Sequence, residues 1–386
     1  MSNDDVKKLP RRDYLLLPLV SVLTIVVMLG AIEAIGRTVY PNYPEYTLDT
    51  CALPPAEGAH HKPDCSVRFK VTEGPAYIES YNDCGYRSIY PCGPKPPGHI
   101  RIAMLGSSFA LGYGVPYEQS FARETEVDLS RSCRRPVEIQ NLSAGFLQPL
   151  QMYGRFDEAL ALQPDLVVVV MNPQDASSDY TSRDIQNRDS PGAVQRKPQP
   201  LPAWRKLAED IKGRFYAIPI AEHFLFLNQA SYIRHYLQYG DEADFLRVPY
   251  SPAWTRRFAN LDILLGGMAD RARAKGVPLV FSLGLQRAQV GLMNDRSWPG
   301  GVDPYAFERE FNRIAAKHGI VNIDPEPDFA RTPNASNLFY AVNAHLNARG
   351  NDVYHQALTR GLLSSNLSVF QGCSDEVASA HPPENK

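Results

Sequence analysis

Ser108 lies in the part of the sequence that most strongly indicates chemistry. The apolar run from Ile100 to Leu105 stops at Gly106, a pair of serines follows, and a helical pattern begins near Gln119. A serine on a turn just after a parallel strand stands clear of the sheet, where a substrate can reach its hydroxyl. Backbone N–H groups at the start of the next helix can then face a developing oxyanion. The pattern is typical of a nucleophile, although Gly-Ser turns also occur in purely structural positions.

Three further motifs follow, each placed where a strand pattern ends or a helix pattern begins. In chain order they are Ser143-Ala-Gly145 after 137–142, Asn172-Pro-Gln-Asp175 after 166–171, and Asn343-Ala-His-Leu-Asn-Ala-Arg-Gly350 before the last helix pattern. The order of these motifs along the chain strengthens the functional interpretation of Ser108.

This succession resembles the SGNH/GDSL hydrolase family, specifically its membrane-anchored bacterial relatives, over roughly residues 98 to 365. In that family a Gly-Asp-Ser-Phe turn, an Asn-x-x-x-Gly turn, a Pro-Asp-hydrophobic strand ending in Asn-Asp, and an Asp-x-His or Asp-x-x-His segment occur in this order. The resemblance implies a serine esterase or O-acyl(acetyl)transferase that needs no metal and no organic cofactor.

The resemblance also assigns roles to single residues. Ser108 matches the nucleophile, Gly106 the turn glycine and His345 the general base. The oxyanion hole would combine the backbone N–H groups of Ser108 and Gly145 with the side-chain amide of Gln174.

Three positions depart from the family pattern. Ser107 replaces the Asp before the nucleophile, Gln174 replaces an Asn, and Asn343 replaces the Asp that orients the histidine. The last departure matters most, because in a serine protease the same Asp→Asn change lowers turnover by about 10⁴. The sequence leaves open a Ser-His dyad, a pseudoenzyme, or a displaced carboxylate supplied by Asp324, Glu326 or Asp328.

Other residues that could do chemistry have weaker support. His355 is the second candidate base, but its position indicates the middle of a helix; His60, His61, His99 and His381 belong to no constellation. A zinc site of Cys65, His60 and His61 fits no recognised ligand spacing. Asp175 is expected to position the Gln174 loop or to cap the next segment.

Strand and helix patterns alternate from residue 100 onward. Strands are predicted at 100–105, 137–142, 166–171, 277–283 and 319–324, and helices at 119–131, 150–162, 254–275, 304–318 and 348–363. This alternation predicts a three-layer α/β fold, flavodoxin-like, with a central parallel sheet. All four motifs would then lie at the carboxyl edge of the sheet, where ligands bind. A flavodoxin-like domain that binds FMN or phosphate is disfavoured, because Gly106 to Gly112 lacks the lysine of a phosphate-binding loop.

The N-terminus predicts a membrane anchor. Leu15 to Ile32 is an 18-residue run without a charge, preceded by four Lys or Arg residues. Such a run reaches about 27 Å, close to the thickness of the hydrocarbon layer. The basic side is expected in the cytoplasm. We therefore predict a cytoplasmic tail (1–12), an uncleaved anchor (13–36), a Pro/Tyr/Cys-rich extension (37–98), an SGNH-like domain (99–366) and a polar tail (367–386).

The cysteines and a long connection complete the organisation. All six cysteines follow the anchor, as expected of an exported domain; the close pairs Cys51/Cys65 and Cys84/Cys92 are attractive, but sequence leaves the pairing open. The connection 176–252 is long for a compact fold and is predicted to be a lid or substrate-shaping insertion, with disorder in 185–200. A decorative surface excursion is the alternative.

The setting narrows the function. A formal charge of −2 gives no reason to expect a nucleic-acid partner. We expect a single-pass protein of the cell inner membrane with its catalytic domain in the periplasm. It would act on ester-linked acyl groups of a cell-envelope or exported polysaccharide, with other envelope polysaccharide proteins as partners. The alternative is an inactive SGNH-like binding or assembly protein of a polysaccharide biosynthesis or secretion system.

Overall fold

A computed structural model describes residues 10, 12–39, 47, 49–53, 59–190, 203, 207, 215–295 and 298–374. The chain divides into two compact units, Met1–Glu45 with Pro200–Leu225, and Tyr46–Gln199 with Phe226–Lys386. The larger unit contains the sheet and every residue predicted to do chemistry. The smaller unit contains the N-terminal helix.

A five-stranded parallel sheet forms the centre of the larger unit. Its strand order is β4-β3-β5-β6-β7. The strands are β3 (Ile100–Gly106), β4 (Val137–Asn141), β5 (Leu166–Met171), β6 (Leu279–Leu283) and β7 (Val321–Ile323). All five lie within one or two residues of the predicted runs. From β3 the chain forms β4 on one side and then β5 on the other side. The carboxyl end of β3 is therefore a topological switch point, the place where parallel sheets bind ligands.

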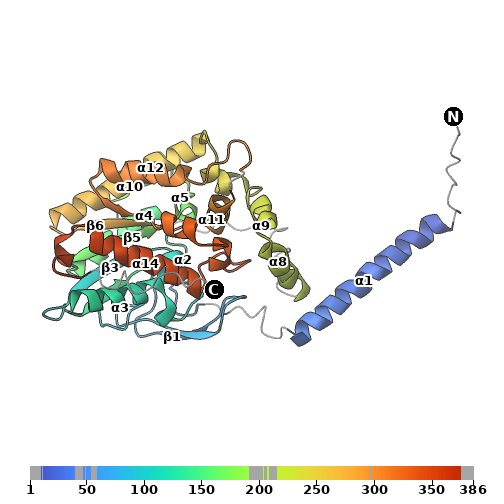
Figure 1. The fold of residues 1–386 in the computed structure, drawn as a ribbon, viewed down its shortest axis with the longest axis horizontal. Coiled ribbons are helices and arrows are strands. Elements are labelled where there is room, and N and C mark those ends of the chain that lie inside the picture. Colours follow the sequence, from blue (N-terminus) through green and yellow to red (C-terminus); the bar gives the residue numbers. More distant parts are fainter. Residues whose placement is uncertain are drawn as a thin grey trace. The chain divides into compact units, whose positions relative to one another are not determined.

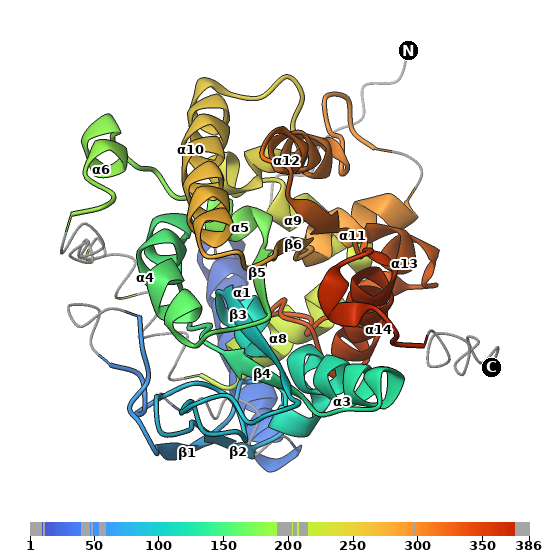
Figure 2. The same cartoon turned by 90° about the vertical axis from the view of Figure 1, so that its left-hand side faces the viewer.

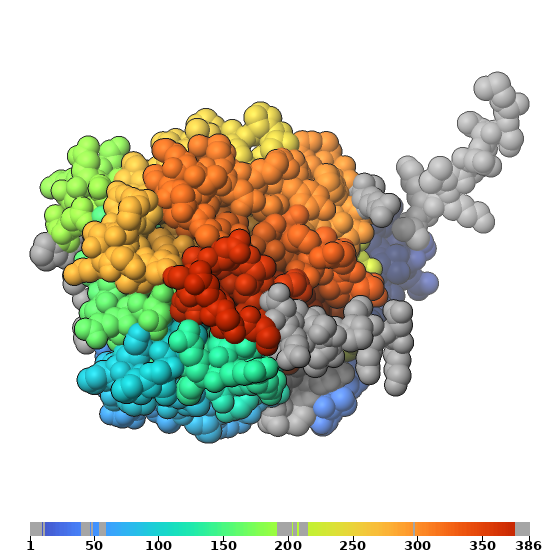
Figure 3. Space-filling view, turned by 60° about the vertical axis from the view of Figure 1, so that its left-hand side comes forward, coloured from blue at the N-terminus to red at the C-terminus, as the bar shows by residue number. Residues whose placement is uncertain are grey.

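Helices cover both faces of this sheet (Figures 1 and 2). One face carries α3 (Phe121–Cys133) and α14 (Ala348–Ser364); the other carries α4 (Pro149–Ala161), α10 (Pro252–Ala274) and α12 (Ala306–Lys317). In the space-filling view of Figure 3, the red surface of α14 lies against the teal surface of α3. The predicted three-layer α/β fold is therefore confirmed.

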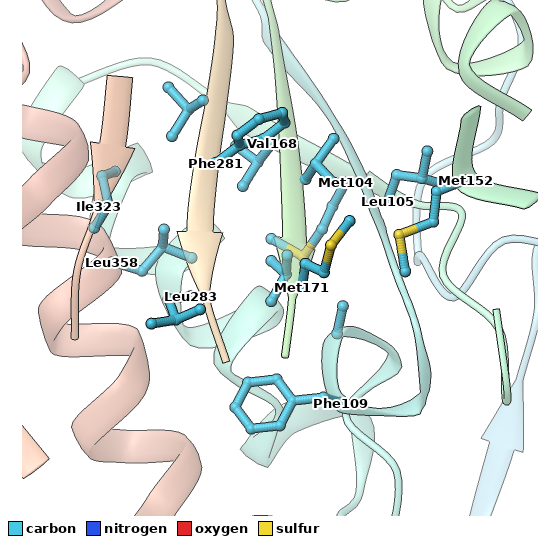
Figure 4. Close-up of a cluster of buried hydrophobic side chains, with 14 of the residues drawn as sticks. Met104, Leu105, Phe109, Met152, Val168, Met171, Phe281, Leu283, Ile323 and Leu358 are labelled. Atoms are coloured by element: carbon cyan, nitrogen blue, oxygen red, sulfur yellow. The ribbon is translucent and has the colours of Figure 1, made fainter. Parts of the chain in front are cut away.

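The sheet is apolar because both of its faces are covered. Every residue of β5 is buried, as a central parallel strand requires. Figure 4 shows the side chains that fill the layers beside it, including Met104 and Val168 from the sheet and Leu358 from α14. Phe109, just after β3, lies at the carboxyl end of this cluster. The core thus extends to the turn that carries Ser108.

The extension before the sheet contains an antiparallel pair that the sequence did not predict. Strand β1 (Ser66–Phe69) pairs with β2 (Tyr77–Ser80). Tyr77, Tyr81 and Tyr86 are buried, so they pack instead of facing solvent. Tyr40, Tyr43 and Tyr46 lie outside the described residues.

Three disulfide bonds cross-link the larger unit. They join Cys51 to Cys65, Cys84 to Cys92 and Cys133 to Cys373. The hypothesis of a zinc site at Cys65, His60 and His61 is wrong, because the Cys65 sulfur is bonded to Cys51 and cannot act as a thiolate ligand. His60 instead contacts Glu158, and His61 contacts Asp49.

The connection between β5 and β6 contains several short helices. They are α5 (Pro173–Ala176), α6 (Ser182–Gln186), α8 (Ala217–Leu227), α9 (Gln229–Tyr236) and the 3₁₀ turn Gly240–Leu246. The predicted disorder at 185–190 is wrong, since these residues complete α6 and the turn after it, where Tyr153 donates to Asp189 at 2.7 Å. The remainder of that stretch, 191–200, lies outside the described residues.

The N-terminal helix α1 (Asp13–Val39) contains the predicted anchor. Its most apolar window has a mean hydropathy of 2.7 with none of it buried, so α1 is long and apolar enough to cross a membrane. The helix continues three residues beyond the predicted end at 36. It is the candidate membrane span within the described residues.

Candidate active site

The turn after β3 places Ser108 at the carboxyl edge of the sheet. Helix α2 (Ser108–Leu111) begins directly at this serine. Gly106 is required there, since a Cβ on it would lie 2.5 Å from the Val170 carbonyl oxygen and from the Ala110 Cβ. The side chain of Asn141, at the end of β4, donates to the Ala110 carbonyl at 2.9 Å. Neighbouring strand ends therefore fix the turn from both sides.

The loop after β4 brings a second backbone amide to the same edge. Ala144 N–H donates to the Gly106 carbonyl at 3.2 Å, which draws this loop against the serine turn. Neither the Ser108 N–H nor the Gly145 N–H has a hydrogen-bond partner among the described residues. Two such donors beside a serine can stabilise an oxyanion.

His345 completes a hydrogen-bonded chain with Ser108. Its Nε2 lies 2.8 Å from the Ser108 Oγ, and its Nδ1 lies 2.7 Å from the Asn343 Oδ1. The amide oxygen can only accept a hydrogen bond, so the proton sits on Nδ1 and leaves Nε2 free to accept from the serine. Tyr113 packs against the imidazole with ring centroids 4.7 Å apart. The three predicted residues are thus brought together in one line.

The electrostatic setting of His345 keeps its imidazole neutral. Burial lowers the pKa of His345 to about 4, and the hydrogen bond with Asn343 offsets only part of that effect. A neutral imidazole can accept a proton at physiological pH. Among the described residues, the hydrogen-bond partners of this ring are Ser108 and Asn343, neither of which is a carboxylate.

None of the carboxylates considered as a substitute reaches this imidazole. Asp328 binds Arg360 at 2.6 Å. Asp324 and Glu326 lie with Glu308 in a group whose oxygen atoms are within 4.8 Å of one another, far along the sheet at the end of β7. The displaced-carboxylate hypothesis is therefore wrong for these three residues, and Asn343 itself faces the histidine.

That acidic group could hold a cation, but it does not touch the serine and histidine. Burial raises the pKa of Asp324 to about 7 and that of Glu326 to about 10, helped by the neighbouring Glu308. Protonation therefore relieves the repulsion between these carboxylates without an ion.

The loop that carries the base is held by a residue that sequence reasoning missed. The Glu73 carboxylate accepts hydrogen bonds from the backbone N–H groups of Val342 and Asn343, at 2.7 and 2.9 Å. Ala344 adopts a left-handed backbone with φ of 61°, which costs about 1 kcal/mol or more for a residue with a Cβ. The two hydrogen bonds that Glu73 accepts stabilise this turn. A single acid in a Pro- and Tyr-rich segment gave no signal of that role.

Other side chains also support both halves of the site. Arg287, at the start of α11 (Arg287–Asn294), donates to the Ala341 carbonyl and stacks over the Tyr232 ring at 3.9 Å. Arg87 donates to the carbonyls of Leu111, Gly112 and Val115 behind the serine helix, at 2.6 to 2.9 Å. The extension therefore contacts both the turn that carries Ser108 and the loop that carries His345.

Gln174 lies at the same edge of the sheet, on α5, and its side chain is exposed. Asp175 accepts from the Asn172 N–H at 2.9 Å and completes a capping box at the start of α5. Burial raises the pKa of Asp175 to about 7, against the opposing effect of the hydrogen bond from the Asn172 N–H. Asp175 therefore positions the loop, as expected.

His355 lies in a setting unlike that of His345. It sits inside α14, with Glu124 3.2 Å from its Nδ1 and Asp128 3.3 Å from its Nε2. Burial alone would lower its pKa, but these carboxylates raise the pKa of His355 to about 9. The ring is therefore a structural cation, and the mid-helix position is confirmed.

Phe146 follows Gly145 and is the most exposed large apolar side chain among the described residues, at 91%. Its φ of 59° is again left-handed, an uncommon conformation for a residue of this size. The ring is thus presented to solvent beside the Gly145 amide.

Comparisons with known proteins give no sequence relative. No family model matches the chain, and no curated protein matches it. Similar solved structures include TesA, with 13% identity and a TM-score of 0.40 over 69% of this chain and 98% of TesA. Others are the acetyl xylan esterase AlAXEase (13% identity, TM-score 0.39, 67% and 98% covered) and a lipase/acylhydrolase from Enterococcus faecalis (11%, 0.38, 68% and 95%). TM-scores this low establish no common family, so the fold class rests on the strand order itself.

Proposed function

We propose that this chain is a membrane-anchored serine esterase or O-acyltransferase of the SGNH type, with its catalytic unit outside the cytoplasm. The observation that carries the proposal is the line from Ser108 Oγ through the His345 ring to Asn343, beside two unpaired amides. The three disulfides support an oxidising compartment. The apolar helix α1 supports a membrane anchor.

The mechanism follows from the positions of the protons. Ser108 Oγ attacks an ester carbonyl while His345 Nε2 takes the hydroxyl proton. The Ser108 and Gly145 amides, with the Gln174 side chain, hold the resulting oxyanion. The alcohol leaves with the proton from His345, and an acyl-serine remains. Water or a sugar hydroxyl then gives a proton to His345 and attacks the acyl carbon. The bond to Ser108 Oγ breaks, and His345 returns the proton to that oxygen.

Asn343 affects the two roles of His345 differently. Its oxygen selects the tautomer that the proton transfer needs, because it accepts from Nδ1–H. As a neutral group it gives the imidazolium less stabilisation than an Asp would, an effect of about 10⁴ in a serine protease. Slow acylation and slow deacylation are therefore expected, whether the acceptor is water or a sugar hydroxyl.

The substrate class is an O-acylated polysaccharide of the cell envelope or an exported one. Phe146 supports a carbohydrate, since an exposed aromatic ring next in sequence to Gly145 can pack on the apolar face of a sugar. Phe146→Ala should raise KM for an acylated oligosaccharide several-fold and leave kcat for a small aryl ester unchanged. An equal loss on both substrates would remove Phe146 from carbohydrate recognition.

The direct test is release or transfer of acetate from an O-acetylated polysaccharide by the full chain in detergent. Wild type should release acetate, or move it to an added oligosaccharide, and Ser108→Ala should do neither. Acetate release without transfer identifies an esterase, and transfer in excess of release identifies a transferase. Equal inactivity of wild type and Ser108→Ala on every acylated glycan and aryl ester would contradict the enzyme proposal.

A second candidate is a binding or assembly protein that no longer catalyses. The absence of a carboxylate at the His345 ring, among the described residues, favours it. The intact Ser108–His345 hydrogen bond favours the enzyme. A binding protein would retain affinity for the glycan in Ser108→Ala and show no turnover in either form.

A further inference from the structure

Helix α8 is apolar on nearly every side, although it is short. Among its residues Ala217–Leu227, Glu222 and His223 are the only ones with charged or titratable side chains. Phe224 and Leu225 are each 55% exposed, and Phe215 just before the helix is 48% exposed. An exposed apolar surface of this kind marks an interaction site.

The start of α8 is bound to the end of the candidate membrane span, within the smaller unit. The Ala217 N–H donates to the Glu33 carboxylate at 2.9 Å, which caps the helix with an anion. The Arg37 guanidinium lies over the Tyr216 ring at 4.5 Å. Figure 1 shows these two helix ends side by side.

A glycine permits this close approach. A Cβ on Gly36 would lie 2.9 Å from the Ile220 Cδ1, closer than real Cβ contacts come. The smallest residue therefore stands where the two helices meet. The contact is packed and is not limited to one hydrogen bond.

The charges on α1 locate the membrane surface. The uncharged stretch from Leu15 to Ile32 is long enough to cross the hydrocarbon layer, and Glu33 and Arg37 follow it as an ion pair of 2.7 Å. Charged groups of this kind are stable at the polar boundary and costly inside it. The first residue of α8, Ala217, is hydrogen-bonded to Glu33. The first turn of α8 therefore lies at that boundary.

We propose that α8 is an interfacial helix that lies in the outer surface of the same bilayer that α1 crosses, with Phe224 and Leu225 inserted among the lipids. Its eleven residues extend about 16 Å, too short to span a membrane. Fully burying one such side chain is worth about 1.5–3 kcal/mol. The helix therefore adds a second, weaker attachment beside the anchor. This inference rests on the membrane anchoring in the proposed function.

Site-specific fluorescence in membranes tests it. All six native cysteines are in disulfides, so a single added cysteine can be labelled with an environment-sensitive nitrobenzoxadiazole dye. The full chain is reconstituted into vesicles of phosphatidylethanolamine and phosphatidylglycerol that carry brominated acyl chains. The positions are Leu23→Cys in α1, Phe224→Cys in α8, and Ile89→Cys, a matched control that is 58% exposed in the larger unit.

The expected result is a blue-shifted emission, quenched at least about two-fold by brominated lipid, for Leu23→Cys and Phe224→Cys, with no change for Ile89→Cys. Quenching at Leu23 without quenching at Phe224 overturns the interfacial helix and leaves the anchor intact. Loss of quenching at Leu23 contradicts the anchor as well as α8. Equal quenching at Ile89 and Phe224 shows general adsorption of the protein and also overturns the proposal.

Discussion

His345 and His355 are ten positions apart, yet their surroundings give them opposite properties. His345 has a neutral amide on one ring nitrogen and a serine on the other, and its pKa falls to about 4. His355 has carboxylates on both nitrogens, and its pKa rises to about 9. At pH 7 the first ring is neutral and can accept a proton, whereas the second is already protonated. The difference shows that the same residue type can be neutral or positively charged at pH 7 according to its partners.

The largest expected effect separates the two histidines by substitution. His345→Ala should lower kcat/KM for an aryl ester by about 10⁴-fold or more, because Ser108 loses its proton acceptor. His355→Gln should leave turnover within about three-fold and lower stability by about 2–4 kcal/mol, because Glu124 and Asp128 lose the cation between them. Ester kinetics and thermal unfolding measure the two effects. A loss of turnover in a stably folded His355→Gln would reverse the assignment.

The second effect concerns the oxyanion donors. Gln174→Ala should lower kcat by about 10²–10³, as the loss of one donor does in other hydrolases, with little change in thermal stability because the side chain is exposed. Gln238→Ala, another glutamine of the same connection, serves as the control. An unchanged kcat in Gln174→Ala would leave the oxyanion to the two backbone amides alone.

The sequence predicted the half of the site that the sheet itself builds. Ser108 and Gly145 each follow a buried strand. An apolar strand that ends in a glycine turn can be recognised from the sequence, because the pattern is local. His345 was also identified, from its motif before a helix. The Glu73 carboxylate that holds the His345 loop was not predicted, because Glu73 is about 270 positions from Val342 and Asn343 in the sequence. A long-range contact of a single polar residue produces no periodic pattern in the sequence.

The same reasoning explains the outcome for the fold. The five core strands and five long helices have apolar periodicity and were predicted within a few residues. The pair β1 and β2 and the helix α11 were not predicted, because they are short and gain their stability from tertiary contacts. Arg287, for instance, is stabilised by the Ala341 carbonyl and the Tyr232 ring, neither of which is near it in sequence.

A third effect tests Glu73 as a positioning residue. Glu73→Gln should lower kcat by about ten-fold with little change in KM, since a neutral amide oxygen is a weaker acceptor for the Val342 and Asn343 amides than a carboxylate. Glu73→Ala should lower kcat further. The exposed Glu118→Gln is the matched control. A change confined to thermal stability, with kcat intact in the folded fraction, would make Glu73 purely structural.

The smallest effect is a shift in pH dependence that makes His345 resemble His355. Asn343→Asp places a carboxylate against Nδ1 and should raise the pKa of His345 from about 4. The acidic limb of kcat/KM should therefore move to higher pH by one unit or more, while turnover above that limb rises at least a few-fold. A pH profile on a small aryl ester measures both. An unmoved limb would mean that residue 343 does not face the ring.

The central claim is that Ser108 is a nucleophile activated by His345. A fluorophosphonate probe, which reacts covalently with activated serines, tests it on the full chain in detergent, with the modified peptide identified by mass spectrometry. Wild type should be labelled at Ser108, His345→Ala should be labelled far more slowly, and Ser108→Ala should remain unlabelled. Folded wild-type protein that stays unlabelled, under conditions that label a reference serine esterase, would contradict the account.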